Sequence, residues 1–320
     1  MLNVYFTVDV EVWCSGWDDL DRKFPDHFKR YVYGTTARGD FGLPYQAKLL
    51  RDHGLVGVFF VEPLFSARFG AQPLEEIVGI LHDGGQEVQM HLHPEWADET
   101  TPPLIPGLSA KRPNIRDFSL EDQTTLIGLG AGMLRRAGAP HFNAFRAGNF
   151  GFNRDTLRAL AANGIAIDSS YNALMFGADS GVMPGVTLTA PLMCEGVCEY
   201  PMTVFRDGVG KLRHAQLTAI SHREMESLLW RALERGDEDF VILSHNFELL
   251  NRSRNMPDEI VVSRFRKLCA FLERNRDSFR ACGLQNAPLK SVAQPPEILA
   301  APLWHTGGRI MEQAYRRKYR

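Results

Sequence analysis

The sequence is poor in cysteine for a chain of 320 residues, and this scarcity excludes one class of protein. Its five cysteines are odd in number and scattered, which argues against the disulfide framework of small secreted domains. Cys194 and Cys198 form a C-x-x-x-C pair, but no second Cys or His pair follows at zinc-finger spacing. Ordinary thiols are therefore favoured over a metal-binding or redox pair.

Long apolar runs and an excess of either charge are also absent. No run of about 18 apolar residues occurs, so no transmembrane helix is predicted. Residues 1–6 lead directly into a strand pattern without the basic and apolar regions of a secretory signal, and we expect a cytoplasmic protein. The 36 basic and 38 acidic residues nearly balance, which argues against nucleic acid or an anionic membrane as the partner. The sequence leaves the oligomeric state open.

What the sequence does contain is a regular alternation of apolar strands and helical patterns. Hydrophobic residues make up 44% and charged residues 23%, as in a soluble globular enzyme with a large core. Strands are predicted at residues 2–11, 57–62, 87–93, 142–146, 165–168 and 239–244. Helices are predicted at residues 44–53, 73–83, 119–137, 154–163, 221–234 and 257–275. This alternation predicts parallel β-α-β units, either in a barrel or in a doubly wound sheet.

Four segments depart from this alternation. Residues 14–42 and 94–118 are expected to be long irregular loops of the binding or lid type. Residues 172–215 contain short strand-like pieces and are interpreted as a β insertion beside the barrel mouth. We divide the chain into a barrel over residues 1–300 and a basic tail over 301–320, which is expected to be a solvated terminal helix, or else a site for an anionic partner.

Two carboxylates stand at the end of the first predicted strand. In residues 7–11 (Thr-Val-Asp-Val-Glu), alternation along a strand places Asp9 and Glu11 on one face and the valines on the other. Carboxylates are costly to hold together unless a metal or a catalytic step uses them. The alternative is a solvated strand end with two unrelated acids.

Two histidines end a later strand in the same way. His91 and His93 share one strand face, Pro94 ends the strand and Glu95 follows. Two imidazoles with a nearby carboxylate suit a divalent metal, whereas the alternative is one core histidine and one surface histidine. Combined with the acids of the first strand, they would form a two-histidine, one-carboxylate site with coordination positions left for water.

Three further polar residues close predicted strands. Arg146 precedes a Gly-Asn turn and suits a charge-assisted pair with a carboxylate, although a surface arginine is the simple alternative. Asp168 could hold a catalytic histidine in one tautomer or could merely cap a turn. His245 suits a general acid or base, with a structural histidine as the alternative. All five motifs lie at the carboxyl ends of strands, where α/β barrels place their active sites.

The order of these motifs resembles the polysaccharide deacetylase family, also called the NodB homology group or carbohydrate esterase family 4. The resemblance spans roughly residues 4–250. Residues 7–11 are similar to the family's T-F-D-D motif, residues 91–94 to its H-[S/T]-x-x-H motif, and residues 146–149 to R-x-P-Y. Residues 168–170 resemble the acidic fourth motif, and residues 243–245 resemble the closing L-x-H motif.

The resemblance implies a distorted (β/α)7-type barrel, a single α/β domain, that removes N- or O-acyl groups from carbohydrate with a divalent metal. Zn²⁺ is the expected ion, with Co²⁺, Ni²⁺ or Mn²⁺ as substitutes. Carried onto this chain, Glu11, His91 and His93 become the metal ligands. Asp9 becomes the base that Arg146 orients and keeps ionised.

His245 becomes the acid for the leaving amine, and Asp168 supports His245 or Arg146. Asn149, Phe150, Trp96 and Leu243 are the expected substrate contacts. Tyr5, Trp13 and Trp17 could stack on sugar, and ordinary burial of aromatic side chains is an equally weighted alternative.

Two departures from the family pattern keep alternatives open. Val10 separates the two acids, and the second histidine stands at i+2 while Glu95 occupies the i+4 position, so Glu95 could replace His93 as a ligand. The alternative functions are an amidase for a small non-sugar amide, such as a ureide, and a barrel that binds glycan without cleaving it. The acylated sugar is not determined by the sequence.

Overall fold

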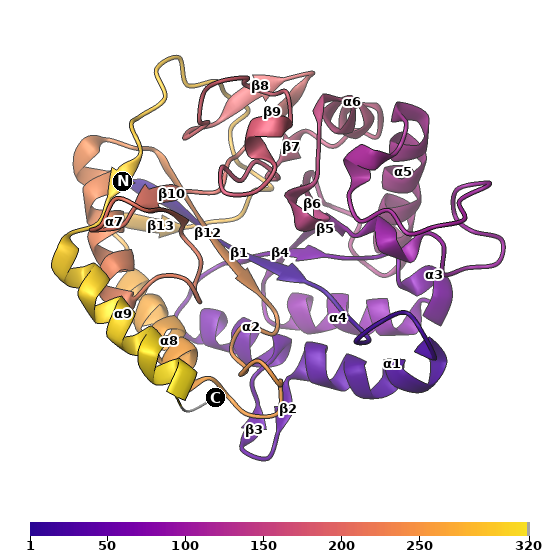
Figure 1. Ribbon diagram of the computed structural model, residues 1–320, viewed down its shortest axis with the longest axis horizontal. Helices are drawn as coiled ribbons and strands as arrows, with labels where there is room; N and C mark the ends of the chain where they lie inside the picture. The colour runs from indigo at the N-terminus through magenta and orange to yellow at the C-terminus, as the bar shows by residue number, and fades with distance from the viewer. Residues whose placement is uncertain (319–320) are drawn as a thin grey trace.

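The computed structural model describes residues 1–318 and forms one curled sheet that is wrapped by helices (Figure 1). The sheet has the strand order β12-β1-β4-β5-β6-β7-β9-β8, and its neighbours are parallel except for the β8–β9 hairpin. Its strands are β1 (Leu2–Val10), β4 (Val58–Val61), β5 (Glu87–Leu92), β6 (Ala144–Ala147), β7 (Ile167–Asp168), β8 (Leu192–Cys194), β9 (Val197–Glu199) and β12 (Asp239–His245). β13 (Phe279–Ala281) pairs with the start of β1.

Helices cover the outer surface of this sheet. The main ones are α1 (Leu20–Phe28), α2 (Leu43–Asp52), α4 (Gln72–Asp83), α5 (Leu120–Arg136), α6 (Arg154–Ala162), α7 (His222–Arg235), α8 (Glu259–Arg274) and α9 (Leu303–Lys318). Shorter turns of helix are α3 (Ser66–Phe69) and the π-helical turn Lys29–Tyr33. Ser119 and Ser221 cap α5 and α7 as the sequence predicts, since each side chain accepts a hydrogen bond from a first-turn amide.

Alternation along the strands creates two apolar cores. The larger core lies between the sheet and the helices and includes Phe6, Val8 and Val10 of β1. The smaller one fills the inside of the curled sheet and includes Tyr5 of β1 and Leu243 of β12. Because a strand exposes alternate residues to opposite faces, the row that contains Tyr5 continues upward through the polar Thr7 and Asp9.

The open side of the curl is closed by an irregular segment. Residues 203–217 run beside β12, where the Ala215 carbonyl accepts from the Leu243 amide at 2.8 Å and the Leu217 amide donates to the Leu243 carbonyl at 3.1 Å. This segment includes β10 (Val204–Arg206) and β11 (Leu212–His214), and β10 also pairs with β14 (Leu299–Ala300). The predicted distorted barrel is confirmed, and the predicted β insertion completes its wall.

The prediction that residues 14–42 are irregular was wrong in part, because they contain α1, the π-helical turn and the small hairpin of β2 (Thr35–Thr36) with β3 (Gly39–Asp40). Helix α1 carries Pro25 in its interior, and its first residues lack a capping side chain, so the usual signals are missing. Leu20, Phe24 and Phe28 still form one buried face at helical spacing. Residues 94–118 are irregular, as expected, with two short 3-10 turns at Pro94–Trp96 and Ile115–Asp117.

Residues 303–318 form a helix as expected, but this helix is not simply solvated. Arg309 is 1% exposed and pairs with Asp207 and Glu224, while Arg316 pairs with Asp258. The sequence pattern misses these partners because they lie about 60 to 100 positions away. Arg320 and the side chains of Arg317 and Lys318 lie outside the described part of the chain.

Two expectations based on absence have structural counterparts. The five cysteines are unpaired, in agreement with the expectation of ordinary thiols rather than disulfides. Within the described residues, none of the helices is both long enough and apolar enough to cross a membrane.

Candidate metal centre

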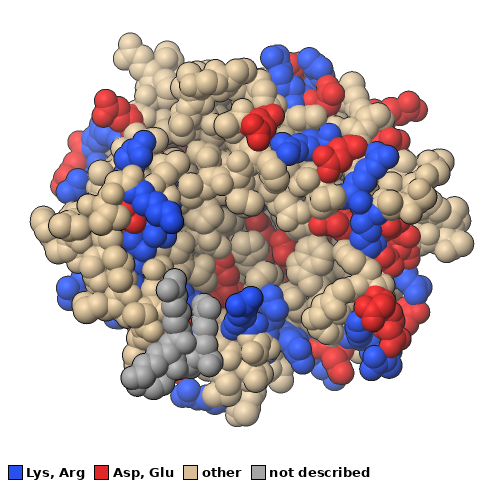
Figure 2. Space-filling model, viewed as in Figure 1, with Lys and Arg blue, Asp and Glu red and all other residues tan. Residues whose placement is uncertain are grey.

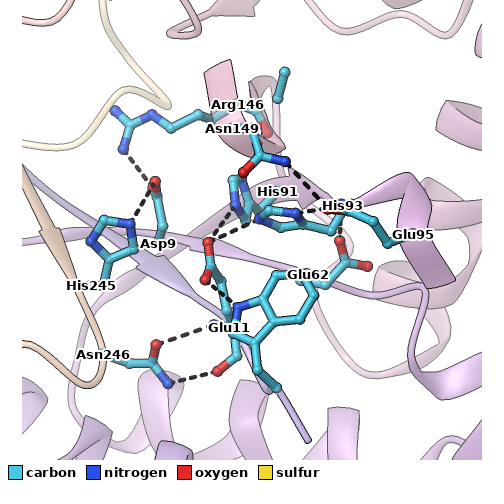
Figure 3. A network of polar contacts seen from close by, with 12 residues as sticks. Asp9, Glu11, Glu62, His91, His93, Glu95, Arg146, Asn149, His245 and Asn246 are labelled. Atoms are coloured by element: carbon cyan, nitrogen blue, oxygen red, sulfur yellow. Dashed lines mark hydrogen bonds and ion pairs between the residues drawn. The ribbon is translucent and has the colours of Figure 1, made fainter. Parts of the chain in front are cut away.

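The carboxyl ends of β1, β5, β6 and β12 bring the predicted site residues together at the barrel mouth (Figure 3). Asp9 and the following Glu11 continue the inner row of β1 and are 2% and 7% exposed. The parallel register sets Asp9 beside His245 of β12, and His91 beside Arg146 of β6. The prediction that Asp9 and Glu11 share one strand face, and that His91 and His93 share another, is therefore correct.

Glu11, His91 and His93 form a compact group of potential metal ligands. Glu11 Oε1 is 3.2 Å from His91 Nε2 and 3.0 Å from His93 Nε2, and the three ligand atoms lie within 4.8 Å of one another. Ligands of a tetrahedral zinc ion at ~2.0–2.1 Å are separated from one another by about 3.3 Å. The donor types and spacings therefore fit a divalent cation bound by two histidines and one carboxylate.

The charge balance around this group also fits a cation. The carboxylates of Asp9, Glu11, Glu62 and Glu95 gather here, whereas Arg146 is the one guanidinium in the network (Figure 3). Burial of several carboxylates without compensating charge is strongly unfavourable. A bound divalent cation would supply the compensation.

The histidines are oriented by contacts on their far sides. His91 Nδ1 lies 2.8 Å from the Arg146 carbonyl, and this contact orients the ring so that Nε2 faces Glu11. His93 Nδ1 lies 3.2 Å from Glu95 Oε2. Glu95 therefore backs His93 rather than replacing it, and the ligand group contains His93.

Gly148 permits this arrangement because it lies directly against His93. A Cβ atom at position 148 would come within 2.5 Å of His93 Nδ1. The family's third motif carries proline at the matching position, and here a residue without a side chain is required by the close approach of the imidazole ring.

Two residues support Glu11 in ways that the sequence did not predict, although Trp13 was a candidate for sugar stacking. Asn246 clamps the Glu11 backbone, accepting from its amide at 3.2 Å and donating to its carbonyl at 3.1 Å. Trp13 Nε1 donates to Glu11 Oε2 at 2.6 Å. Asn246 directly follows His245, and Trp13 closely follows Glu11, so their proximity to the motifs was the available signal.

Glu62 is a buried carboxyl group behind His93 that the sequence analysis did not anticipate. It accepts from the backbone amides of His93 and Leu64, and burial raises the pKa of Glu62 to about 8. It ends an apolar strand, as Asp9 does, and this position was its only sequence signal.

Asp9 and Arg146 form the core of the second half of the site. Arg146 Nη1 donates to Asp9 Oδ1 at 2.6 Å and to Thr7 Oγ1 at 2.9 Å, while Arg146 Nε donates to the Ser169 carbonyl at 3.0 Å. The fully buried guanidinium also lies over the Phe60 ring, 4.2 Å from its centroid. These contacts fix the position of the carboxylate.

His245 faces the other oxygen of Asp9. Its Nε2 is 3.9 Å from Asp9 Oδ2, too long for a direct hydrogen bond, and its Nδ1 is 2.8 Å from Glu248 Oε1. Glu248 thus holds the imidazole, a role that the sequence interpretation had offered to Asp168. Asp168 instead accepts from Ser170 Oγ at 2.6 Å, and burial raises the pKa of Asp168 beside Glu199.

The buried charges of the site shift the pKa values of three of its side chains, Glu11, His93 and His245. Burial raises the pKa of Glu11, but the charge of His93 and hydrogen bonds from both histidines outweigh burial and hold that pKa well below its ordinary value. Burial lowers the pKa of His93 and of His245, but Glu11 raises the former well above its usual value, and Glu248 raises the latter to about 9. His245 is therefore protonated at neutral pH, as an acid must be before it donates.

The expected substrate contacts are placed unequally. Trp96 is 1% exposed and packs among aromatic rings, so its predicted contact with substrate is wrong for this conformation. Leu243 lies in the inner core one layer below His245, and Phe150 is also buried there. Asn149 is exposed at the mouth, where its Nδ2 donates to the Pro113 carbonyl at 2.9 Å.

The remaining aromatic candidates divide in the same way. Tyr5 is buried inside the barrel, whereas Trp13 and Trp17 are half-buried near the mouth. Trp17 also carries the Lys111 ammonium 3.7 Å above its ring centroid. Stacking on sugar therefore stays a prediction for Trp13 and Trp17, which lie in the segment that follows β1.

Sequence comparisons do not identify a relative: no family model matches the chain, and no curated protein matches it. Solved structures do match. A Mycobacterium smegmatis protein assigned provisionally as a polysaccharide deacetylase superposes with a TM-score of 0.56 at 16% identity, covering 92% of this chain and 95% of that one. A family 4 carbohydrate esterase from Streptomyces lividans, solved with acetate, gives 0.45 at 12% identity over 91% and 97% of the two chains.

A family 4 carbohydrate esterase pseudoenzyme from Bacillus anthracis gives a TM-score of 0.42 at 12% identity over 90% of this chain and 66% of that one. The fold assignment rests on the Mycobacterium smegmatis protein, whose TM-score exceeds 0.5. The fold is thus that of the polysaccharide deacetylases, a NodB-like distorted barrel. Its mouth carries a buried Glu-His-His group that could hold a metal ion.

Proposed function

We propose that this protein is a metal-dependent hydrolase that removes an N-acetyl or related acyl group from a carbohydrate. The observation that carries the proposal is the meeting of two groups at one barrel mouth. Glu11, His91 and His93 supply three converging ligand atoms, and the Asp9 carboxylate faces a protonated His245 beside them. A base and an acid beside a metal group are the parts that metal-assisted amide hydrolysis requires.

Each half of the site has a distinct task in this proposal. A divalent cation held by Glu11, His91 and His93 would polarise the acyl carbonyl and make water a better nucleophile. Asp9 takes a proton from the water that adds to the acyl carbon, and the hydrogen bond from Arg146 orients the Asp9 carboxylate for this step.

His245 then gives a proton to the departing nitrogen, so the C–N bond breaks into a carboxylate and an amine. Glu248 holds His245 in position for this transfer. A backbone amide near Asn149 is our candidate for the oxyanion contact.

Metal analysis of the purified protein tests the first half of the proposal. After reconstitution with Zn²⁺, we expect about one ion per chain, lost in Glu11→Ala, His91→Ala and His93→Ala and kept in Glu95→Ala, because Glu95 contacts only the far side of His93. Loss of the ion in Glu95→Ala alone would overturn the ligand assignment. Absence of a specific ion in the unmodified protein would favour the glycan-binding barrel.

Product analysis tests the second half. Acetate released from N-acetylated oligosaccharides by the zinc-loaded protein would support the proposal. Ammonia or formate released from small amides or ureides would move the assignment to the non-sugar amidase.

A further inference from the structure

A cavity of about 580 Å³ opens beside His245, on the side away from the metal group, and its walls carry unusual positive charge. Arg252, Arg254 and Arg316 line it together with His245. The one carboxylate in the lining is Glu248, which is already bonded to His245 and Gln216. Figure 2 shows the hollow near the middle of this face, with acidic side chains inside it and basic side chains directly below.

Arg254 differs from the neighbouring arginines because it lacks a carboxylate partner. Arg316 pairs with Asp258 at 2.7 Å, and the nearby Arg264 pairs with Glu312 at 2.6 Å. Among the described residues, no acidic side chain pairs with Arg254, and its buried Nε lacks any hydrogen-bond partner. A guanidinium has five donors in a fixed fork, so an arginine without a carboxylate partner at a cavity wall can donate hydrogen bonds to the acceptor atoms of a ligand.

The Arg254 guanidinium is nevertheless held in place. It lies 4.5 Å from the Tyr31 ring centroid and 4.7 Å from that of Phe247. The Phe247 ring lies in turn 5.3 Å from the His245 ring. One aromatic ring therefore separates the Arg254 guanidinium from the imidazole of the candidate catalytic acid.

We propose that this cavity binds an anionic group, a phosphate or a carboxylate, attached to the same sugar that carries the acyl group. The inference rests on the proposed function and narrows its substrate class to anionic acylated sugars. Arg254 supplies the charge-assisted fork to the anion, and Arg252 adds positive charge at the rim. Both are binding residues, because neither reaches the acyl group.

Calorimetric titration with sugars that lack an acyl group tests the anion site independently of deacetylase activity. Glucose 1-phosphate, glucuronate and glucose are titrated into the unmodified protein, Arg254→Gln and Arg136→Gln. Arg136 is the matched control, since it is exposed at the end of α5, where the chain turns toward the opposite end of the barrel. We expect one of the anionic sugars to bind at least tenfold more tightly than glucose, and this preference to disappear in Arg254→Gln alone.

Repeating the titration on chelator-stripped protein separates the cavity from the metal group, because phosphate also binds metal ions. Anion binding that persists without metal and depends on Arg254 supports the proposal. Binding that vanishes on stripping but survives in Arg254→Gln would place the anion on the metal and overturn it. Equal binding of all three sugars would also overturn it. The anionic sugar that binds more tightly identifies the anionic group as a phosphate or a carboxylate.

Kinetics then distinguish this proposal from the function on which it rests. With N-acetylglucosamine 1-phosphate, whose phosphate and acetamide are on adjacent carbons, Arg254→Gln should raise KM on the order of tenfold with little change in kcat. Deacetylation of neutral N-acetylated sugars at the same kcat/KM, unaffected by Arg254→Gln, would refute the anion site and leave the deacetylase intact. Anion binding without any deacetylation would instead refute the deacetylase function and leave the anion site intact.

Discussion

Two buried clusters of charge in this molecule differ in whether they are complete. Under α9, Arg309 Nη2 lies 2.8 Å from Asp207 Oδ2, and Arg309 Nε lies 3.0 Å from Glu224 Oε2. Arg213 adds a second contact to Asp207 at 2.8 Å, and Thr306 donates to Glu224 at 3.0 Å. Two cations therefore face two carboxylates, and no further charge is required.

At the barrel mouth the carboxyl groups outnumber the guanidinium groups, and three potential ligand atoms converge on one point. His91 Nε2 and His93 Nε2 both approach Glu11 Oε1. The comparison indicates how to separate a structural charge cluster from a functional one: the first satisfies its members internally, whereas the second leaves room for a cation and for proton transfer. Changes in the mouth should alter chemistry and metal binding, whereas changes under α9 should alter stability.

The largest effect is expected for Asp9→Asn. An amide cannot accept the proton of the attacking water, so kcat should fall on the order of a thousandfold, while zinc content stays near one ion per chain. Steady-state acetate release and metal analysis on the same preparation measure both. A fully active Asp9→Asn protein would refute the assignment of the base, and loss of zinc would place Asp9 among the ligands.

Arg309→Ala should lower the free energy of unfolding by about 3 kcal/mol, because it leaves Glu224 buried without its cation. Urea denaturation followed by circular dichroism measures this loss. Arg274→Ala, at an exposed position of α8, is the matched control and should stay within about 0.5 kcal/mol of the unmodified protein. A similarly small change in the free energy of unfolding for Arg309→Ala would show that the charge cluster under α9 does not stabilise the fold.

Zinc should stabilise the folded protein by about 2.7 kcal/mol at a hundredfold excess over its Kd. His93 must lose its proton to bind metal, and Glu11 raises the pKa of His93, so this gain should shrink as the pH falls. Without metal the sign is opposite, since the raised pKa of His93 stabilises the protein at low pH and this contribution is lost as the pH rises. Thermal melting with and without zinc at several pH values tests this, and an equal gain in Glu11→Ala would contradict it.

Glu248→Gln is the smallest and most specific change. Removal of the carboxylate lowers the pKa of His245 from about 9, so the alkaline fall in kcat/KM, where the acid loses its proton, should move to lower pH by roughly one unit. Turnover at the acid side should change little. An unmoved pH profile would show that His245 is not the group titrating there, and Asp168→Asn is the control because it leaves the Glu248 contact intact.

Local patterns in the sequence were enough to predict the main strands and helices and the edge of the sheet at which the candidate site lies. Period-two alternation in residues 7–11 and 91–93 set the faces of Asp9, Glu11, His91 and His93, and strand ends followed by Pro94 or Gly148 marked the barrel mouth. Such patterns are local, since each depends on a few neighbouring residues. The barrel, its strands and the meeting of Glu11, His91 and His93 were therefore predictable.

The side chains that support the candidate site could be identified only once the fold was known. Glu248 rather than Asp168 holds His245, Glu95 and Glu62 back His93 from two different strand ends, and the predicted contact Trp96 is buried. The same applies to Arg309, whose partners lie on a distant helix and loop. These outcomes depend on contacts between segments far apart in the chain, and periodicity within a segment carries no information about which segment will face it.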